Sequence, residues 1–543
     1  MFFDPTRLLD CQRHMSLGKA PKQEEIFRSS RDFCGERLSE TSVYRLLSKE
    51  CHRLFPDEAF ADLFQDVGRR SVPPRIVAVV MVLQRLEGLS DREAVDRFAF
   101  DLRWKYAAGD LDLEYPGFVH TVLVDMRARL RESKNPDRIF QAVLDVARAA
   151  GHIGRKRVLD STALYDAVAT QDTITLIRSA IRGLLRVVES GVAVELRAVL
   201  KREDDYLEAG KPVCDWDDKV AREELIDALA KDAHVALALL DGRTLVEEVK
   251  RAAELLATVV GQDLEQSQDG KFRIAWRVAA DRVISTVDPE ARHGHKTAAR
   301  GFDGYKGHVS VDPDSELIVA TTVTAGNVAD GAAAEELLKE ALSPEAQAAP
   351  AGQGAEPVEV YGDASYGTAE ILEQLEAAGA EANVKVQPPS AREGIFSKAA
   401  FTVDLEAGTV RCPAGIIATI RPVAAGGGKA SFGANCKTCP LQSKCTNSRK
   451  GRSINVHPKE AILERHRQRQ RSPEWKAKYR GTRPKVERKF GHLMRHRHGG
   501  RRARVRGRTR IGGDFALLAA GTNLKRMAVL AHRATLRLSA ARK

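Results

Sequence analysis

The chain has 543 residues, of which 43% are hydrophobic and 29% charged, and its formal net charge is +12. This length exceeds what one hydrophobic core usually serves, so we expect two to four units of ordinary globular composition. The first residues include an early acid and a proline, unlike a secretory signal, and the longest strongly apolar run, residues 76–83, is too short to span a bilayer. We therefore expect a cytoplasmic protein with no membrane partner.

Residues 1–150 have the pattern of a helical domain. Pro73 and Pro74 open an apolar run that Gly88 ends, and Ser90 with Glu93 three residues later is a capping box that predicts a new helix. Two helices joined by a short turn are compatible with DNA binding. Small helical domains with no such role are common, so this alternative stays open.

An α/β pattern follows, divided by a helical insertion. Residues 151–174 hold a short strand that Asp160 interrupts, and residues 175–274 return to helical periodicity. Residues 275–395 hold a predicted hairpin, a helix, a strand ending on Asp363, a second helix and a last strand. The predicted fold class is therefore α/β, with a mixed sheet, an all-α N-terminal domain and a helical insertion.

Residues 396–450 form a Cys-rich insertion. Cys412 stands alone, and Cys436, Cys439 and Cys445 follow as a C-x2-C-x5-C run. Four thiolates at this spacing suit a structural Zn²⁺ ion with tetrahedral geometry. Absence of any metal, an iron–sulfur cluster and paired disulfides are the alternatives, although a cytoplasmic compartment disfavours disulfides. Basic side chains on this small zinc-type insertion, Lys429, Lys437, Lys444 and Arg449, could touch DNA.

Residues 451–530 are helical and carry most of the excess positive charge, and residues 531–543 are a predicted tail. Between Lys476 and Arg510 there are 15 Lys or Arg and one acid, Glu487, which gives +14 and leaves −2 for the rest of the chain. A charge block this dense favours a polyanionic partner, most commonly nucleic acid. Glu487 then lies where phosphates would lie. An ion pair with Arg483, four residues earlier, is the simpler explanation of this acid.

Three acids occupy positions that chemistry can use: Asp160 in the first core strand, Asp363 after a later strand, and Glu487 on a helix. Groups at strand carboxyl ends converge on one edge of an α/β sheet, and three carboxylates there would need cations. Two Mg²⁺ ions about 3.5–4 Å apart are the usual solution for attack on a phosphodiester. Three other acids compete with Asp363, but capping explains Asp330 and turns before proline explain the other two, Asp288 and Asp312.

The order of these elements resembles the RNase H-like core of DDE transposases of bacterial insertion sequences. The resemblance rests on residues 281–296 (DRVISTVDPEARHGHK), 304–306 (GYK), 326–330 (GNVAD) and 362–367 (GDASYG). In the N-terminal region, residues 89–93 (LSDRE) and 101–106 (DLRWKY) are similar to the helical domain of the same transposases. Around the glutamate, Arg483 and Glu487 match the family pattern, whereas Arg480 and Met494 stand where many relatives have Tyr and Lys.

This resemblance implies an enzyme that cleaves DNA at terminal inverted repeats and transfers the 3′-hydroxyl ends to target DNA. It implies two catalytic Mg²⁺ ions held by Asp160, Asp363 and Glu487, double-stranded DNA as partner, a homodimer on paired ends, and association with the nucleoid. An RNase H-fold nuclease without strand transfer and a non-catalytic zinc-containing DNA-binding protein are the alternatives. The expected DNA contacts are Arg480, Arg483, Lys489, Arg495, Arg501, Arg502 and Arg504.

Overall fold

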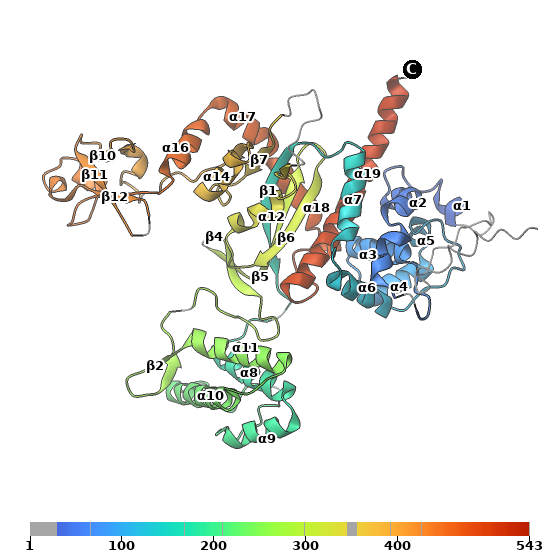
Figure 1. Cartoon of the computed structure of the whole chain (residues 1–543), viewed down its shortest axis with the longest axis horizontal. Coiled ribbons are helices and arrows are strands. Elements are labelled where there is room, and N and C mark those ends of the chain that lie inside the picture. The colour runs from blue at the N-terminus through green and yellow to red at the C-terminus, as the bar shows by residue number, and fades with distance from the viewer. Residues whose placement is uncertain are drawn as a thin grey trace, which may run out of the picture.

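The computed structural model describes residues 30–541 except 66, 168, 209, 278, 298, 345–355, 391 and 425. Residues 1–29 of the predicted first domain and residues 542–543 of the predicted tail lie outside this set. A mixed sheet forms the centre, with helices packed on it and two peripheral units extending from it (Figure 1). No helix among the described residues is long and apolar enough to cross a membrane.

The N-terminal region is helical, as predicted. Ser90 Oγ accepts a hydrogen bond from the Glu93 N–H at 3.3 Å, and the Glu93 carboxylate accepts one from the Ser90 N–H at 2.7 Å, which confirms the capping box. Gly88 ends the preceding helix with a φ of 71°, a left-handed conformation that glycine adopts without strain. The helices are α1 (Ser30–Cys34), α2 (Val43–Leu54), α3 (Pro74–Glu87), α4 (Asp91–Phe100), α5 (Leu102–Ala107), α6 (Thr121–Glu132) and α7 (Arg138–Ala149).

The central sheet has the order β4-β5-β1-β7-β8, with β6 also paired to β5. Strand β1 runs antiparallel to β5 and parallel to β7, and β8 runs parallel to β7. The predicted hairpin is confirmed as β5 and β6, but β4 was not foreseen because its His- and Gly-containing sequence lacks a strand pattern. The strands are β1 (Lys156–Tyr165), β4 (Arg292–Thr297), β5 (Arg300–Asp312), β6 (Leu317–Ala325), β7 (Glu359–Gly362) and β8 (Glu381–Val384).

The last helix, α19 (Arg508–Ala541), joins the N-terminal helices to the sheet. It packs against α3 and β6, and its buried residues, such as Phe515 and Leu518, share one hydrophobic cluster with both. Helix α3 is consequently buried from Pro74 to Leu86, which explains the unbroken apolar run between Ile76 and Leu83. The predicted tail at residues 531–543 is, as far as it is described, the end of α19.

The helical insertion forms a hydrophobic cluster of its own, lying apart from the central sheet (Figure 1). Leu184, Leu229 and Leu256, from three different helices, are fully buried in that cluster. A short hairpin follows the helices and leads back to the sheet. The elements are α8 (Thr173–Val187), α9 (Ser190–Val199), α10 (Lys219–Leu240), α11 (Glu247–Asp263), β2 (Leu264–Gln266) and β3 (Phe272–Ile274).

The Cys-rich insertion is a five-stranded antiparallel sheet, which the sequence did not indicate because its strands are short and polar. Its strands are β9 (Thr402–Asp404), β10 (Thr409–Arg411), β11 (Ile417–Pro422), β12 (Gly428–Ser431) and β13 (Ser453–Val456). Four helices flank the central sheet: α12 (Ala334–Leu338), α14 (Ala369–Ala377), α16 (Glu460–Arg469) and α17 (Pro473–Thr482). The predicted break before Glu487 is confirmed, since Pro484 begins a new helix, α18 (Pro484–Leu493).

Candidate active site

Asp160 and Asp363 lie beside each other because of the register of two parallel strands. Val158 on β1 pairs with Tyr361 on β7, and two further residues along each strand lead to Asp160 and Asp363. Neighbouring strands are about 4.8 Å apart, so the two carboxylates start from adjacent backbone positions. The register therefore brings together the first two acids that the sequence singled out.

Arg483 connects Asp160 to Glu487. Its Nη2 lies 3.0 Å from Asp160 Oδ2, and its Nη1 lies 3.7 Å from Glu487 Oε1. The Arg483 side chain is 9% exposed, whereas that of Glu487 is 67% exposed. The pair with Arg483 that was the simpler explanation of Glu487 is thus observed, but the same guanidinium also pairs with Asp160 on the sheet.

The electrostatic environment of Asp160 is unusual for a carboxylate. Burial raises its pKa to about 6, against the lowering effect of Arg483 and of the Ser161 N–H, and the charge of Asp363 raises it further. Burial lowers the pKa of Arg483, but the charges of Asp160, Tyr479 and Asp363 and the hydrogen bond to Asp160 together outweigh burial, so the pKa is raised. A further cation between the two aspartates would favour their ionised forms.

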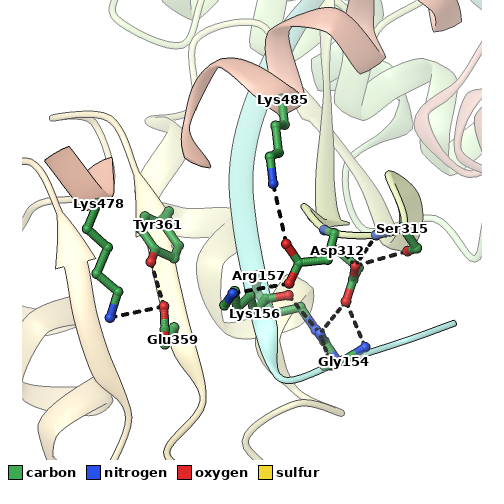
Figure 2. Close-up of polar contacts among 10 residues, drawn as sticks. Gly154, Lys156, Arg157, Asp312, Ser315, Glu359, Tyr361, Lys478 and Lys485 are labelled. Atoms are coloured by element: carbon green, nitrogen blue, oxygen red, sulfur yellow. Dashed lines mark hydrogen bonds and ion pairs between the residues drawn. The ribbon is translucent and has the colours of Figure 1, made fainter. Parts of the chain in front are cut away.

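Polar contacts fix α17 and α18 to the sheet and so position Arg483 and Glu487 (Figure 2). On α17, Lys478 Nζ lies 3.2 Å from Glu359 Oε2 on β7, and the Tyr479 hydroxyl donates to the Gly362 carbonyl at 3.2 Å. On α18, Lys485 Nζ lies 3.3 Å from Asp314 Oδ1. Helix α17 is therefore tied to β7, and α18, the helix that carries Glu487, is tied to the turn after β5.

The competing acids have structural partners, although not always those expected. Asp330 does not cap its helix. Its carboxylate instead accepts from Ser161 Oγ at 2.6 Å and from Lys306 Nζ at 2.8 Å, next to Asp160. The sequence did not predict these contacts, because Asp330, Ser161 and Lys306 are far apart along the chain.

The other two competitors are buried. Asp288 accepts a hydrogen bond from the Tyr305 hydroxyl at 2.6 Å. Asp312 makes the predicted turn, accepting from the Ser315 N–H at 2.8 Å, and it also accepts from the Gly154 N–H at 2.7 Å (Figure 2).

A cavity of about 460 Å³ opens beside these acids. It is lined by Asp363, Ala364, Ser365, Lys385, Tyr479, Arg480, Arg483, Pro484 and Glu487. Lys385 was not predicted, although it directly follows β8 as Asp363 directly follows β7. Within the described ranges, no group of three or more His, Cys, Asp or Glu side chains is arranged to hold a metal ion. The cavity thus combines two of the three acids with cations at its rim.

The four cysteines line one small cavity of about 20 Å³ in the Cys-rich insertion. They are free thiols and do not form a metal-binding group, so the structure gives no support to the predicted zinc ion. Burial raises the pKa of Cys445. What holds the insertion together here is an apolar cluster that includes Phe401, Phe432 and Ile454.

The expected DNA-binding residues separate into exposed and buried ones. Arg480, Arg495 and Arg502 are exposed, while Arg501 and Arg504 are half-buried. Lys489 is buried, and burial lowers its pKa to about 7, so it does not lie on a surface that a phosphate could reach. Arg483 is also buried and, although it lines the cavity, its guanidinium is paired with Asp160. The segment after Gly500 is packed, since the Tyr165 N–H donates to the Arg501 carbonyl and the Ala503 N–H donates to the Tyr165 carbonyl, both at 2.8 Å.

A buried histidine in this segment predicts a pH-dependent stability. His498 is 2% exposed, its Nδ1 lies 2.6 Å from the Leu86 carbonyl, and burial lowers its pKa to about 4. The unfolded chain takes up this proton near pH 6.5, so stability is fully present above that pH and is lost as pH falls toward 4. We expect His498→Gln to reduce the acid-side loss of stability, which for one group is at most about 1.4 kcal/mol per pH unit.

The measurement is thermal or urea unfolding at intervals between pH 4 and pH 8. His496→Gln is the matched control, because His496 is exposed. Equal pH profiles for wild type and His498→Gln would contradict the assignment.

Two segments of the chain match family models. Residues 412–528 match a model described as a transposase DDE domain, and residues 33–129 match one described as a transposase domain (DUF772). Comparison with curated proteins and with solved structures gives no significant match. The first match contains Glu487 and Arg483, whereas Asp160 and Asp363 lie outside both matched segments.

Proposed function

We propose that this chain is an insertion-sequence DDE transposase that cleaves DNA at terminal inverted repeats and joins the freed 3′-hydroxyls to target DNA, and its matches to a transposase DDE domain and to a transposase domain support this. The observation that carries the proposal is the register of β1 on β7, which sets Asp160 beside Asp363. Helix α18, which the ion pair of Lys485 with Asp314 holds in place, carries Glu487 to the cavity that Asp363 also lines.

The order of the strands supports an RNase H-like core. Taken in chain order as strands one to five, β1, β5, β6, β7 and β8 lie in the spatial order 3-2-1-4-5. The second strand is antiparallel to the first, and the fourth is parallel to it. These are the relations that the family resemblance implies, with the acids on strands one and four.

The three acids fit divalent cations in their chemistry. Carboxylate oxygens are the ligands that Mg²⁺ prefers, together with water and substrate phosphates. Asp160, Asp363 and Glu487 would hold Mg²⁺, which when bound supplies an activated oxygen nucleophile and neutralises the leaving oxygen. Glu487 is mostly exposed and held by one long ion pair, so turning toward the aspartates costs it little.

The side chains of this chain would orient the DNA. Arg480 and Lys385 are exposed and line the cavity, where they can pair with phosphates on either side of the scissile bond. Exposed Arg495 and Arg502 extend this positive surface. Arg483, which is buried, instead positions Asp160 and Glu487. Joining two ends to one target also requires two active sites, so we propose a homodimer on paired ends.

A strand-transfer assay tests the proposal. Purified protein is incubated with Mg²⁺, a supercoiled target and a duplex that carries the inverted repeat flanking its gene. The expected products are 3′-hydroxyl cleavage at the repeat and covalent joining of that end to the target. Cleavage without joining would instead identify a nuclease, and binding without cleavage would identify a non-catalytic DNA-binding protein.

A further inference from the structure

The Cys-rich insertion carries a block of positive charge that the proposed catalytic function does not use. Residues 407–459 contain no Asp or Glu and nine Lys or Arg, a net charge of +9. This block is separate in the sequence from residues 476–510. In the structure it belongs to the sheet β9–β13, which lies beyond α16, on the other side of the central sheet from the N-terminal helices (Figure 1). A second basic surface at this place needs an explanation of its own.

The register of the strands collects several of these cations on one face. Arg421 on β11 pairs directly with Lys429 on β12, and Lys429 pairs with Asn455 on β13. The adjoining row, Ile420, Ala430 and Ile454, points into the apolar cluster of the insertion. Two like charges directly opposite each other destabilise a sheet. An anion lying across the pair would relieve this repulsion.

Seven of the nine cations are exposed, and among the described residues none of the seven makes an ion pair: Arg411, Arg421, Lys429, Lys437, Lys444, Arg449 and Lys450. The remaining two have structural contacts. Arg452 donates to the Phe396 carbonyl at 3.0 Å, and Lys459 pairs with Glu373. Three of the seven, Arg411, Arg421 and Lys429, lie on one face of the sheet by its register, and we call the seven exposed cations together the insertion face.

The side chains around these cations indicate which nucleic acid fits. The exposed positions of the five strands hold hydroxyl groups, at Thr402, Thr419, Ser431 and Ser453, together with the amide of Asn455, one acid, Asp404, one aliphatic residue, Ile417, and no aromatic residue. Hydroxyl, amide and cationic groups contact phosphates and sugars. Sites for single strands add aromatic side chains on which bases stack. The composition of the insertion face therefore matches the backbone of a duplex.

We propose that the insertion face binds the phosphate backbone of double-stranded DNA, without sequence preference, at a site separate from the catalytic cavity. This inference rests on the proposed function, since it gives the transposase a second contact with DNA. The duplex held at the cavity, or the target that receives its end, would continue onto β11 and β12. The contact lies on the side of the cavity away from the N-terminal helices and lengthens the DNA footprint in that direction.

The experiment measures the salt dependence of duplex binding by the full chain. A fluorescent random-sequence duplex of about 30 base pairs is titrated at several NaCl concentrations with wild type and with the Arg421→Ala/Lys429→Ala double variant. Each lost phosphate contact removes about 0.9 from the log–log salt slope. The slope should fall by up to about 2, and the affinity at 0.1 M salt should fall on the order of tenfold.

The matched control is Lys250→Ala/Arg251→Ala on α11. It removes the same charge from exposed residues that pair with Glu254 and Glu247. Its salt slope should equal that of wild type. A second pair, Lys437→Ala/Lys444→Ala, lies outside the strands and should reproduce the loss if the sheet variant folds poorly. Unchanged slopes in both insertion variants, or equal losses in the α11 control, would overturn the proposal.

Two further measurements separate this proposal from the other conclusions. A single-stranded oligonucleotide should show a smaller change than the duplex, and an equal or larger change would overturn the assignment to duplex DNA. Mg²⁺-dependent cleavage is measured on the same preparations. If wild type cleaves DNA but the salt slopes of the variants are unchanged, only the proposal for the insertion face is wrong. If the variants have reduced salt slopes but wild type does not cleave, only the proposed catalytic function is wrong.

Discussion

Asp160→Asn, Asp363→Asn and Glu487→Gln are each expected to lower Mg²⁺-dependent cleavage by about 10³-fold or more, or about 4 kcal/mol of activation free energy. Each change keeps the shape of the side chain and removes one charge from the proposed metal site. The triple variant should be no worse than a single one, because groups that act as a unit are not additive. Initial rates on a labelled terminal-repeat duplex give the measurement.

Duplex binding should remain within about threefold of wild type in all three variants, since each change removes negative charge from a DNA-facing cavity. Glu464→Gln on α16 is the matched control, because Glu464 is a half-buried acid that does not line the cavity. Its cleavage rate should be that of wild type. If any one of the three variants cleaves DNA at the wild-type rate, the acid replaced in that variant is not part of the proposed metal site.

The predictions that the structure confirmed depend on local signals. The capping box at Ser90 and the break at Pro484 are set by neighbouring residues and are visible in a short stretch of sequence. The hairpin β5–β6 follows from two strand patterns joined by a turn. The proximity of Asp160 to Asp363 was expected from the rule that strand ends converge, and the parallel register of β1 and β7 supplies it.

The features that the sequence did not reveal depend on tertiary packing. Lys489 looked like one more cation in a basic block, but its position on α18 turns it into the interior. Asp330 looked like a helix cap, and only the folded sheet brings Ser161 and Lys306 to it. The sheet of the Cys-rich insertion was hidden because its strands are short and one face is polar. Cysteine spacing alone suggested a zinc ion that the packing of the thiols does not support.

The sequence also did not reveal that α19 packs on β6. From this contact we expect a large loss of stability when Asn523 is replaced. Asn523 on this helix is fully buried, and its side chain pairs with the backbone of β6. Its Oδ1 accepts from the Ile318 N–H at 2.9 Å, and its Nδ2 donates to the Ile318 carbonyl at 2.7 Å. The amide therefore completes the hydrogen bonds of a strand residue that lies under a helix, where water cannot replace it.

Asn523→Ala is expected to destabilise the central core by about 2–6 kcal/mol, because it leaves two buried backbone groups unpaired at about 1–3 kcal/mol each. The urea midpoint of the transition that unfolds the sheet, followed by circular dichroism, is the measurement. Asn447→Ala is the control, since Asn447 is exposed, and it should leave the midpoint unchanged. Because the helical insertion has a hydrophobic cluster of its own, its transition should move less than that of the sheet. Equal midpoints for Asn523→Ala and wild type would show that α19 is held to β6 by its apolar residues alone.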